Sequence, residues 1–309
     1  ISIGDLYTQS CKEGELLTAL ATIRPREILL AEEIISENKK LTTMIDNKLT
    51  ATISPLTANI TNIEKLKKLI CMYFNVKSLD SFGSFSDCEI GACWSLLEYI
   101  KLTQKVNLPP IRFPKSIKTE SNMQIDPFTR KSLEISETLH GERKGSLLYA
   151  IDRTLTAAGA RQLDKDISSP LTSVEKIERR LVMLEYLYKN KTIRENLREL
   201  LKNSADIGRA KARIISGRGD PKDLLSIKMG IITGKKLKKE FQNSIQEKEK
   251  KDFDNIIKFL GSCDKLHGVL NDAIVEKLPS NSSEGGFIAE GYSSKLDKLR
   301  ELRNESRKY

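Results

Sequence analysis

The chain is 309 residues long, a length typical of two domains rather than one. Hydrophobic residues make up 39% and charged residues 30%, but aromatic residues only 6%, which favours long helices with charged outer faces over an aromatic-rich β-sandwich. No stretch approaches the ~18 apolar residues of a membrane-spanning helix, so the sequence predicts no membrane association.

Positive charge is concentrated in the second part of the chain. The first 118 residues hold 15 basic and 13 acidic residues, and the remainder holds 37 basic and 29 acidic residues. The net charge of +10 therefore divides into +2 and +8. This excess fits a polyanionic partner, although surface lysines that keep a protein soluble would produce it as well.

Cysteine usage and the start of the sequence indicate the setting of the protein. Five cysteines at irregular spacing predict reduced, buried thiols of a cytoplasmic protein rather than a disulfide framework. Because the sequence begins at Ile1, without Met or a signal-like segment, we expect an internal piece of a longer protein.

Residues 1–117 alternate between strand and helix patterns and predict an α/β domain. The apolar run 27–31 is expected to be a buried strand. A capping box from Thr61 to Glu64 then opens a helix with apolar residues at helical spacing up to Phe74. A polar loop around Gly83 precedes a second helix that reaches about Lys105, before a proline-containing linker.

Residues 118–309 have a helical period almost throughout and predict an all-α bundle. Capping boxes are expected at 172–175 and 192–195, and an aspartate before proline at 220–221 is expected to cap another helix. One predicted apolar stripe consists of Ile177, Leu181, Leu184 and Tyr188. The charged segment 244–254 is expected to be a solvated helix or loop, and a last helix begins near Ser293.

The sequence offers no catalytic, cofactor-binding or metal residues. His140 and His267 are the only histidines, and neither has the spacing of a triad or a metal site. The glycine–lysine run at 230–236 is one residue short of a phosphate-binding loop and follows a helix instead of a strand. The glycine-rich turn from Gly141 to Ser146 is able to hold a phosphate, but a simple loop before a helix is the better interpretation.

Several basic clusters admit either a solvated helix face or a phosphate-contacting patch. They are Lys235, Lys236, Lys238 and Lys239, then Lys248, Lys250 and Lys251, then Arg300, Arg303, Arg307 and Lys308. A phosphate-contacting role is favoured only for the last cluster, and only because of the resemblance described next. Aromatic residues interleaved for base stacking are absent, which argues against single-strand or RNA recognition.

Three stretches occur in order along the second part of the chain. The first is Ile125-Asp126-Pro127-Phe128-Thr129-Arg130-Lys131-Ser132-Leu133-Glu134, continued by Gly145-Ser146-Leu147-Leu148 and by Asp152-Arg153-Thr154-Leu155-Thr156 up to Gly159 and Arg161. The second is Asp206-Ile207, Arg209, Arg213, Gly217-Arg218, Pro221 and Asp223-Leu224. The third is Gly285-Gly286-Phe287-Ile288, Gly291-Tyr292 and Leu296-Asp297-Lys298-Leu299-Arg300. Together they resemble the MutS family of bacterial DNA mismatch-repair proteins, with Ser132 replacing the usual asparagine.

The resemblance implies an RNase-H-like α/β connector domain at 1–117, which the match supports more loosely, and a helical core and lever domain at 118–309. The chain would stop where the DNA-gripping clamp begins. The parent protein would be a homodimeric, DNA-dependent ATPase that uses ATP and Mg²⁺, binds mismatched double-stranded DNA, and recruits a MutL-type partner through the connector. Its mismatch wedge would lie before Ile1 and its ATP-binding loop beyond Tyr309.

The resemblance also implies roles for single residues. Arg303, Arg307 and Lys308 are candidate contacts to the DNA backbone. The motif residues Asp126, Thr129, Arg130, Asp152, Thr154, Thr156 and Arg161 are expected to form buried or half-buried hydrogen-bonded junctions, because unpaired polar groups are costly inside a helical core. Gly159 is expected to permit a close helix approach.

Two other hypotheses remain open at this point. The chain could be a stand-alone interaction or scaffold module that is related to MutS and lacks the ATPase. It could also belong to the relatives of MutS that act on recombination intermediates, although these usually lack the connector. For the chain itself we expect no ATP hydrolysis and only weak, salt-sensitive DNA binding.

Overall fold

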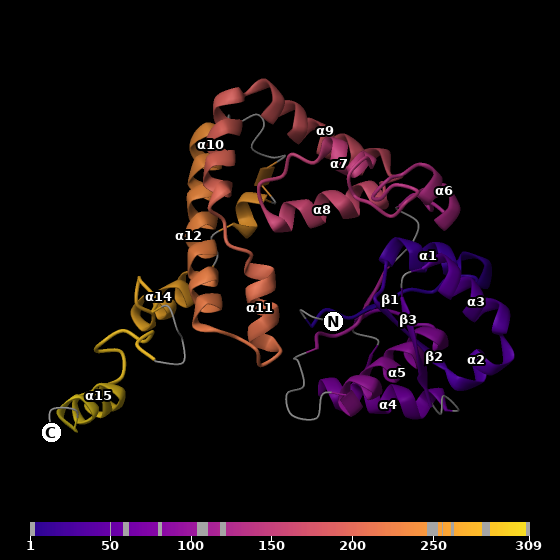
Figure 1. Cartoon of the computed structure of the whole chain (residues 1–309), viewed down its shortest axis with the longest axis horizontal. Helices are drawn as coiled ribbons and strands as arrows, with labels where there is room; N and C mark the ends of the chain where they lie inside the picture. Colours follow the sequence, from indigo (N-terminus) through magenta and orange to yellow (C-terminus); the bar gives the residue numbers. More distant parts are fainter. Residues whose placement is uncertain are drawn as a thin grey trace. The chain divides into compact units, whose positions relative to one another are not determined.

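The structure is a computed structural model that describes residues 4–49, 51–57, 62–79, 82–103, 111–117, 122–245, 253–254, 256–260, 263–279 and 285–306. The chain divides into two compact units. The first unit contains residues 1–154 and 159–178, and the second contains residues 155–158 and 179–309. The fold is mixed α/β and mostly helical, and all strands of the described residues lie in the first unit (Figure 1).

Strands of the first unit form two parallel pairs. Strand β1 (Tyr7–Thr8) pairs with β4 (Lys115–Ser116), and β2 (Glu27–Ala31) pairs with β3 (Thr52–Leu56). The predicted strand at 27–31 is confirmed, although only Ile28 in it is buried. Parallel partners need long crossover connections, and helices provide them here.

Five helices accompany these strands. They are α1 (Leu16–Ile23), α2 (Glu32–Glu37), α3 (Lys39–Lys48), α4 (Ile63–Phe74) and α5 (Asp87–Thr103), with a short 3₁₀ turn, η1 (Glu13–Glu15), before α1. In Figure 1 the strands lie between α1–α3 and the packed pair α4–α5. The core between α4 and α5 consists of Leu6, Leu66, Ile70, Leu79, Ile90, Cys93 and Leu97.

Helix α4 begins one residue later than the sequence pattern suggested. Its N-cap is Asn62, whose side chain accepts a hydrogen bond from the Lys65 amide at 3.0 Å. The predicted cap Thr61 lies outside the described residues. Asparagine caps helices as well as threonine does, so the sequence alone did not distinguish the two neighbours.

Three short helices and part of a fourth complete the first unit. They are α6 (Pro127–Ser132), α7 (Leu147–Ile151) and α8 (Ala157–Ser168), followed by the first turns of α9 (Val174–Lys189). An antiparallel bridge between Asn122 and Leu171 ties the segment before α6 to the segment after α8.

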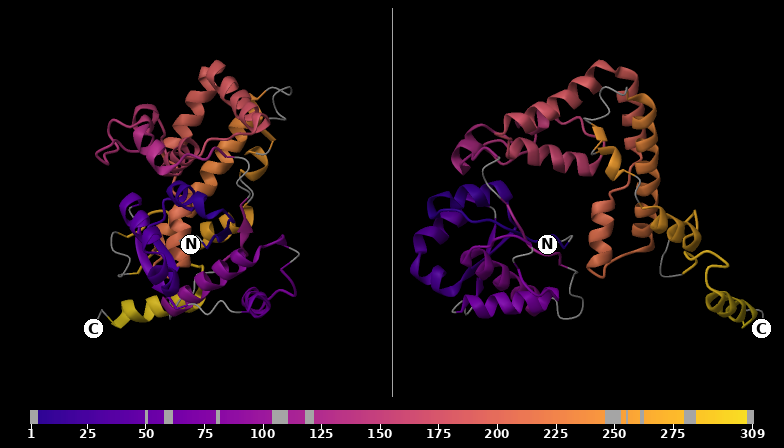
Figure 2. Two further views of the ribbon diagram at one scale, coloured as in Figure 1. Left: turned by 90° about the vertical axis from the view of Figure 1, so that its right-hand side faces the viewer. Right: turned by 180° about the vertical axis from the view of Figure 1, so that it is seen from behind.

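The second unit is built on one long helix. Helix α12 (Pro221–Ser244) contacts α10 (Lys191–Lys202), α11 (Ile207–Ile215) and α14 (Asp264–Ala273), as Figure 2 shows from two sides. Helix α15 (Ser294–Ser306) is the last described element. Two core clusters hold the unit together: Tyr186, Leu197, Phe241, Ile245, Phe253 and Ile257 in one, and Ile231, Leu270, Ala273 and Ile274 in the other.

The predicted cap before α12 is confirmed, and the predicted cap at Thr192 is wrong. Asp220 accepts from the Lys222 amide at 2.8 Å, and Pro221 occupies the first helical position. Helix α10 instead begins at Lys191, so Thr192 lies inside the helix. The residue before α10, Asn190, donates its side-chain amide to the Tyr186 carbonyl and does not cap the helix.

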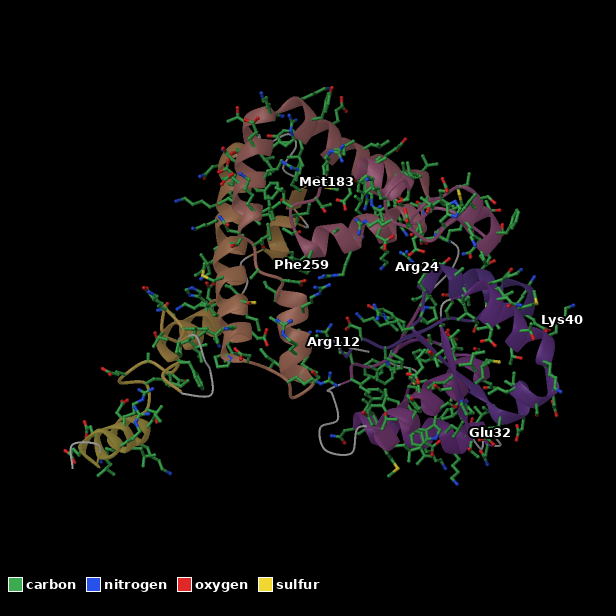
Figure 3. All side chains as sticks on the ribbon, viewed as in Figure 1. Arg24, Glu32, Lys40, Arg112, Met183 and Phe259 are labelled. Carbon is green, nitrogen blue, oxygen red and sulfur yellow. The ribbon has the colours of Figure 1, made fainter. Side chains whose placement is uncertain are left out.

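The apolar stripe predicted on α9 is not the buried face. Leu181, Leu184 and Tyr188 are exposed by 54%, 66% and 79%. The residues of α9 that pack in the core are Tyr186, Leu187 and Met183, the last of which is labelled in Figure 3. Helix α9 carries apolar residues on two faces, so spacing alone did not identify the packed one.

Two other expectations need correction. Within the charged segment 244–254, Ile245 and Phe253 are buried core residues, while 246–252 lie outside the described residues. All five cysteines are free thiols, but Cys11, Cys88 and Cys263 are exposed and only Cys93 is buried. Burial raises the pKa of the Cys93 thiol to about 12.

We found no helix among the described residues that is long and apolar enough to cross a membrane.

Close packing of α11 on α12 generates a prediction about Gly230. A Cβ atom at this position would overlap the side chain of Ile207. We expect Gly230→Ala to forfeit most of the gain of up to ~1 kcal/mol in helix propensity, because the end of the Ile207 side chain, which is 39% exposed, must move away. Thermal unfolding followed by circular dichroism measures the change.

Gly268 in α14 is the matched control, since a Cβ there meets nothing within 4 Å. Gly268→Ala should raise the free energy of unfolding by about 0.5–1 kcal/mol. Equal effects of the two substitutions would contradict the proposed close contact.

Candidate functional site

Helix α6 begins with a local polar cap. Asp126 accepts hydrogen bonds from the amides of Phe128 and Thr129 at 2.9 and 3.0 Å, and from the Thr129 hydroxyl at 2.5 Å. The Thr129 hydroxyl, together with these amides, lowers the pKa of the Asp126 carboxyl. Both side chains are exposed, contrary to the expected half-buried junction, because the carboxylate serves amides of its own first turn and needs no tertiary partner.

Arg130, one turn further, is the buried member of this motif, with 9% of its surface exposed. Its Nη2 donates to the Thr22 hydroxyl of α1 at 3.4 Å, but its Nε and Nη1 have no hydrogen-bond partner among the described residues. Burial lowers the pKa of Arg130, and the charge of Arg24 adds to this effect while Asp164 opposes it. The guanidinium still carries its charge at neutral pH, so an incompletely paired cation lies inside the first unit.

Asp164 of α8 compensates for this charge and joins α8 to α1. It accepts from Arg24 Nη2 at 2.5 Å and from the hydroxyls of Ser136 and Ser168 at 3.2 and 3.3 Å. Arg24, labelled in Figure 3, ends α1 in the left-handed conformation at φ 49°. We call Arg24, Arg130, Ser136, Asp164 and Ser168 the arginine junction.

Sequence reasoning singled out Arg130 but missed its partners. Arg24 and Asp164 are 140 residues apart, and neither belongs to a recognisable local motif. A charged residue that pairs at such a distance leaves no periodic signal in the sequence. The structure is therefore needed to show that the α/β part and the segment 126–168 share polar contacts.

A second cluster surrounds Asp152, just after α7. Its carboxylate accepts from the amide and hydroxyl of Thr154 at 3.0 and 2.7 Å, and from Arg143 Nη2 at 2.5 Å. The Thr154 hydroxyl and amide, with Arg143, lower the pKa of Asp152. The structure thus brings the predicted Asp152 and Thr154 together.

The remaining motif residues lie near the start of α8. Thr156 and Gly159 are half-buried, whereas Arg161 is exposed rather than buried or half-buried as expected. A long side chain on the outer face of a helix reaches solvent even when its backbone is packed.

In the second unit, an ion pair between the exposed Arg213 and the buried Asp223 joins α11 to α12. Arg213 donates to Asp223 through Nε at 2.8 Å and through Nη2, and only 3% of the Asp223 side chain is exposed. The other Asp223 oxygen accepts from the Asp220 amide at 3.1 Å and completes the capping box. These hydrogen bonds, Arg213 first, lower the pKa of Asp223, and the same pairing raises that of Arg213.

The predicted DNA-contacting residues are only partly covered by the structure. Arg303 lies on α15 and is exposed, while Arg307 and Lys308 lie outside the described residues. Arg300 has a structural role, since it donates to Asp297 at 3.2 Å and to the Ile288 carbonyl at 2.8 Å.

The described residues hold no group of three or more His, Cys, Asp or Glu that is arranged to bind a metal ion. The glycine–lysine run 230–236 lies within the continuous helix α12. A helical backbone directs its amides into the helix, so this run forms no phosphate-binding loop.

Two family models match the chain, and the gap between them lies inside the first compact unit. The family model of MutS domain II matches residues 1–112, and that of MutS domain III matches residues 128–309. The chain belongs to the MutS family. Proteins named DNA mismatch repair protein MutS from Rickettsia rickettsii (strain Sheila Smith) and Rickettsia felis are each 36% identical to it, over 309 and 307 residues.

These matches cover 100% and 99% of this chain but only 35% and 34% of the relatives. The chain thus spans about a third of the length of the relatives it matches. Both matched MutS domains are represented, and the arginine junction connects residues from each, with Arg24 in domain II and Asp164 in domain III.

The arginine junction predicts opposite effects of two substitutions. Arg130→Met should raise the free energy of unfolding by about 1–2 kcal/mol, because it replaces an incompletely paired buried charge with an apolar side chain of similar length. Asp164→Asn should lower the free energy of unfolding by about 1–3 kcal/mol, because Arg24 and Arg130 then face each other without a carboxylate. The partial exposure of Arg24 keeps the loss within this range.

Urea unfolding followed by fluorescence of Trp94 measures both changes, because Trp94 is the only tryptophan and packs against the core of the first unit. Lys131→Met, at an exposed position of the same helix, controls for the change in composition. A destabilising Arg130→Met would contradict the assignment.

The Arg213–Asp223 pair predicts a dependence of stability on pH. The folded-state pKa of Asp223 is lowered, so its contribution is present above the unfolded-state pKa of about 4 and is lost as pH falls through the folded-state value. We expect Asp223→Asn to lower the free energy of unfolding at neutral pH by about 1–3 kcal/mol.

Because the variant lacks the titrating group, it should also lose less stability than the unmodified chain between neutral pH and about pH 3. Thermal unfolding across this range, with exposed Asp272→Asn as the control, measures the difference. If the stability of Asp223→Asn and of the unmodified chain fell in parallel with pH, the Arg213–Asp223 pair would be excluded as the cause of the acid loss of stability.

Proposed function

We propose that this chain is the segment of a DNA mismatch-repair protein that couples conformational changes in a mismatch-reading part to an ATPase and a clamp. The observation that carries the proposal is the co-linear match of MutS domains II and III over most of the chain, with relatives named DNA mismatch repair protein MutS. In this proposal, ATP and Mg²⁺ act in the parent protein, and the segment itself catalyses no reaction.

The finer division is also part of the proposal. Residues 1–117 form an RNase-H-like connector domain, and residues 118–309 form the core and lever that end at the clamp. The position of β4, the last described strand, at Lys115–Ser116 supports the boundary. The compact first unit extends past it, since the arginine junction attaches α6 and α8 to the α/β part.

A transmitting role needs elements that move as rigid bodies. Helix α12 is 24 residues long, and its start is fixed twice, by the capping box of Asp220 and by the ion pair of Arg213 with the buried Asp223. A helix fixed in this way carries a displacement at one end to the other instead of fraying. The motif residues Asp126, Thr129, Arg130, Asp152, Thr154, Thr156, Gly159 and Arg161 serve as positioning residues in the same proposal.

The partners follow from the parent protein. They are mismatched double-stranded DNA, a MutL-type partner through the connector, and a second copy through parts mostly outside this chain, all in the cytoplasm. Nothing in the comparisons favours a stand-alone scaffold, because the reported relatives carry the mismatch-repair name.

DNA binding by the 309-residue chain tests the proposal. We expect binding to a short duplex with a dissociation constant of about 10⁻⁴–10⁻⁶ M near physiological salt, equal for matched and mismatched duplexes. Log affinity falls with log salt concentration, and Arg303→Gln should reduce the steepness of this fall by about one, because one phosphate contact is lost. Fluorescence anisotropy over a range of salt concentrations measures both.

Lys39→Gln removes one exposed charge from α3 and serves as the control. An unchanged slope in Arg303→Gln would exclude Arg303 as a contact. A preference of the chain alone for mismatched duplexes would overturn the assignment of mismatch reading to another part of the protein.

A further inference from the structure

Helix α9 carries a second apolar face besides the one that packs in the core. Its residues follow one another at alternating intervals of three and four: Val174, Ile177, Leu181, Leu184 and Tyr188. We call these five residues the outer stripe. Four of them are exposed by 54% or more, and Ile177 is half-buried. An apolar face of this kind that is left in water usually marks a surface on which another element packs.

The outer stripe lies almost opposite the packed face of the same helix. Successive residues of an α-helix are about 100° apart, so Tyr186 is about 200° away from both Leu184 and Tyr188. Tyr186, Leu187 and Met183, which Figure 3 labels, form the packed face. Covering the outer stripe therefore requires an element other than the core that α9 already contacts.

The spacing of the outer stripe fits a single facing helix. Apolar residues at alternating intervals of three and four are the pattern of a helix–helix seam, in which each side chain inserts between four side chains of the partner. A strict seam is narrower than the apolar face with which a helix covers a globular core. The outer stripe keeps the seam pattern along most of the 16 residues of α9, which is enough for two heptads.

Acidic residues border one side of the outer stripe. Glu178 and Glu185 are both exposed, are one heptad apart, and directly follow Ile177 and Leu184 of the stripe. Residues at such positions flank a helix–helix seam and select partners by charge. Glu185 forms an ion pair with Lys189 of its own helix, so the pair of glutamates is not a strong binding site by itself. It favours a facing helix that carries Lys or Arg on the same side.

The length of the relatives indicates where such a helix comes from. The match to the Rickettsia rickettsii protein covers 35% of that protein, so the other 65% lies outside the matched part. A helix of the same polypeptide is held near the outer stripe at a high effective concentration, which gives it an advantage over a separate partner.

We infer that the outer stripe of α9 packs against an amphipathic helix from a part of the parent protein that lies outside these 309 residues. That helix carries apolar residues at heptad spacing and basic residues beside Glu178 and Glu185. The inference rests on the proposed function, in which the chain is one segment of a longer mismatch-repair protein.

The test measures the rate at which hydroxyl radicals oxidise Tyr188, followed by mass spectrometry of the peptides. It compares the 309-residue chain with the parent protein translated from the whole reading frame. Tyr188 is 79% exposed in the chain, and we expect it to react about fivefold more slowly in the parent protein, because a packed helix removes its ring from water.

Two substitutions in the parent protein show whether the outer stripe causes this protection. Leu184→Gln places an amide in the seam and should bring the Tyr188 rate to within about twofold of the rate in the 309-residue chain. Val182→Gln is the matched control, since Val182 is 41% exposed on the same helix but lies outside the outer stripe, and it should leave the slow rate unchanged. If Leu184→Gln abolishes the helical circular dichroism of the parent protein, Leu184→Ala and Val182→Ala replace the two variants.

Equal Tyr188 rates in the two proteins, or equal responses to the two substitutions, would overturn the inference. A dimer of the 309-residue chain that Leu184→Gln dissociates in sedimentation velocity would identify a second copy as the partner, and this outcome also overturns it. The reading frame tests the proposed function separately, because it either encodes a mismatch wedge and an ATP-binding loop or lacks them, whatever the Tyr188 rate is. A reading frame of only these 309 residues would overturn both.

Discussion

The carboxylate of Asp164 is the interaction on which the first unit depends. It faces two arginines and two serine hydroxyls, and no other carboxylate contacts this cluster among the described interactions. Arg24 ends α1 and Arg130 lies on α6, so Asp164 on α8 binds Arg24 directly and acts on Arg130 through its charge. The cluster is polar and incompletely paired, which makes it a specific connection rather than a strong one.

In the second unit, helices are joined by an ion pair between residues that are close in the sequence. Arg213 and Asp223 are 10 residues apart and join the end of α11 to the start of α12. Asp223 also belongs to the capping box. One of its oxygens accepts from Arg213 of α11, and the other accepts from the Asp220 amide at the start of α12. Such a carboxylate is fully engaged, in contrast to the buried Arg130, and its pair stabilises the α11–α12 connection without leaving a charge unpaired.

Local features of the sequence predicted local structure well. The aspartate–proline start of α12 and the strand at 27–31 follow from propensities that act over a few residues. Choices between neighbours failed: Asn62 rather than Thr61 caps α4, and Thr192 lies inside α10. Tertiary contacts decided the rest, since no local pattern reveals that Asp164 faces Arg24 or which face of α9 is packed.

The candidate sites show the same limit. The glycine-rich turn before α7 was visible in the sequence, but the gathering of Arg143 and Arg153 around Asp152 depends on how the loop returns to the end of the helix. The family resemblance identified Arg130 and Asp152 as residues with a role, without indicating that one is buried and the other half-buried. Burial depends on packing partners, which the spacing of residues does not specify.

The separation of Arg24 and Asp164 by 140 residues also bears on the order in which the chain folds. Contacts between neighbouring helices, such as α11 with α12, close short loops and form early, whereas the arginine junction must close a very long one. During synthesis, α1 leaves the ribosome well before α8 exists. We therefore expect the arginine junction to form after the shorter-range contacts of the α/β part.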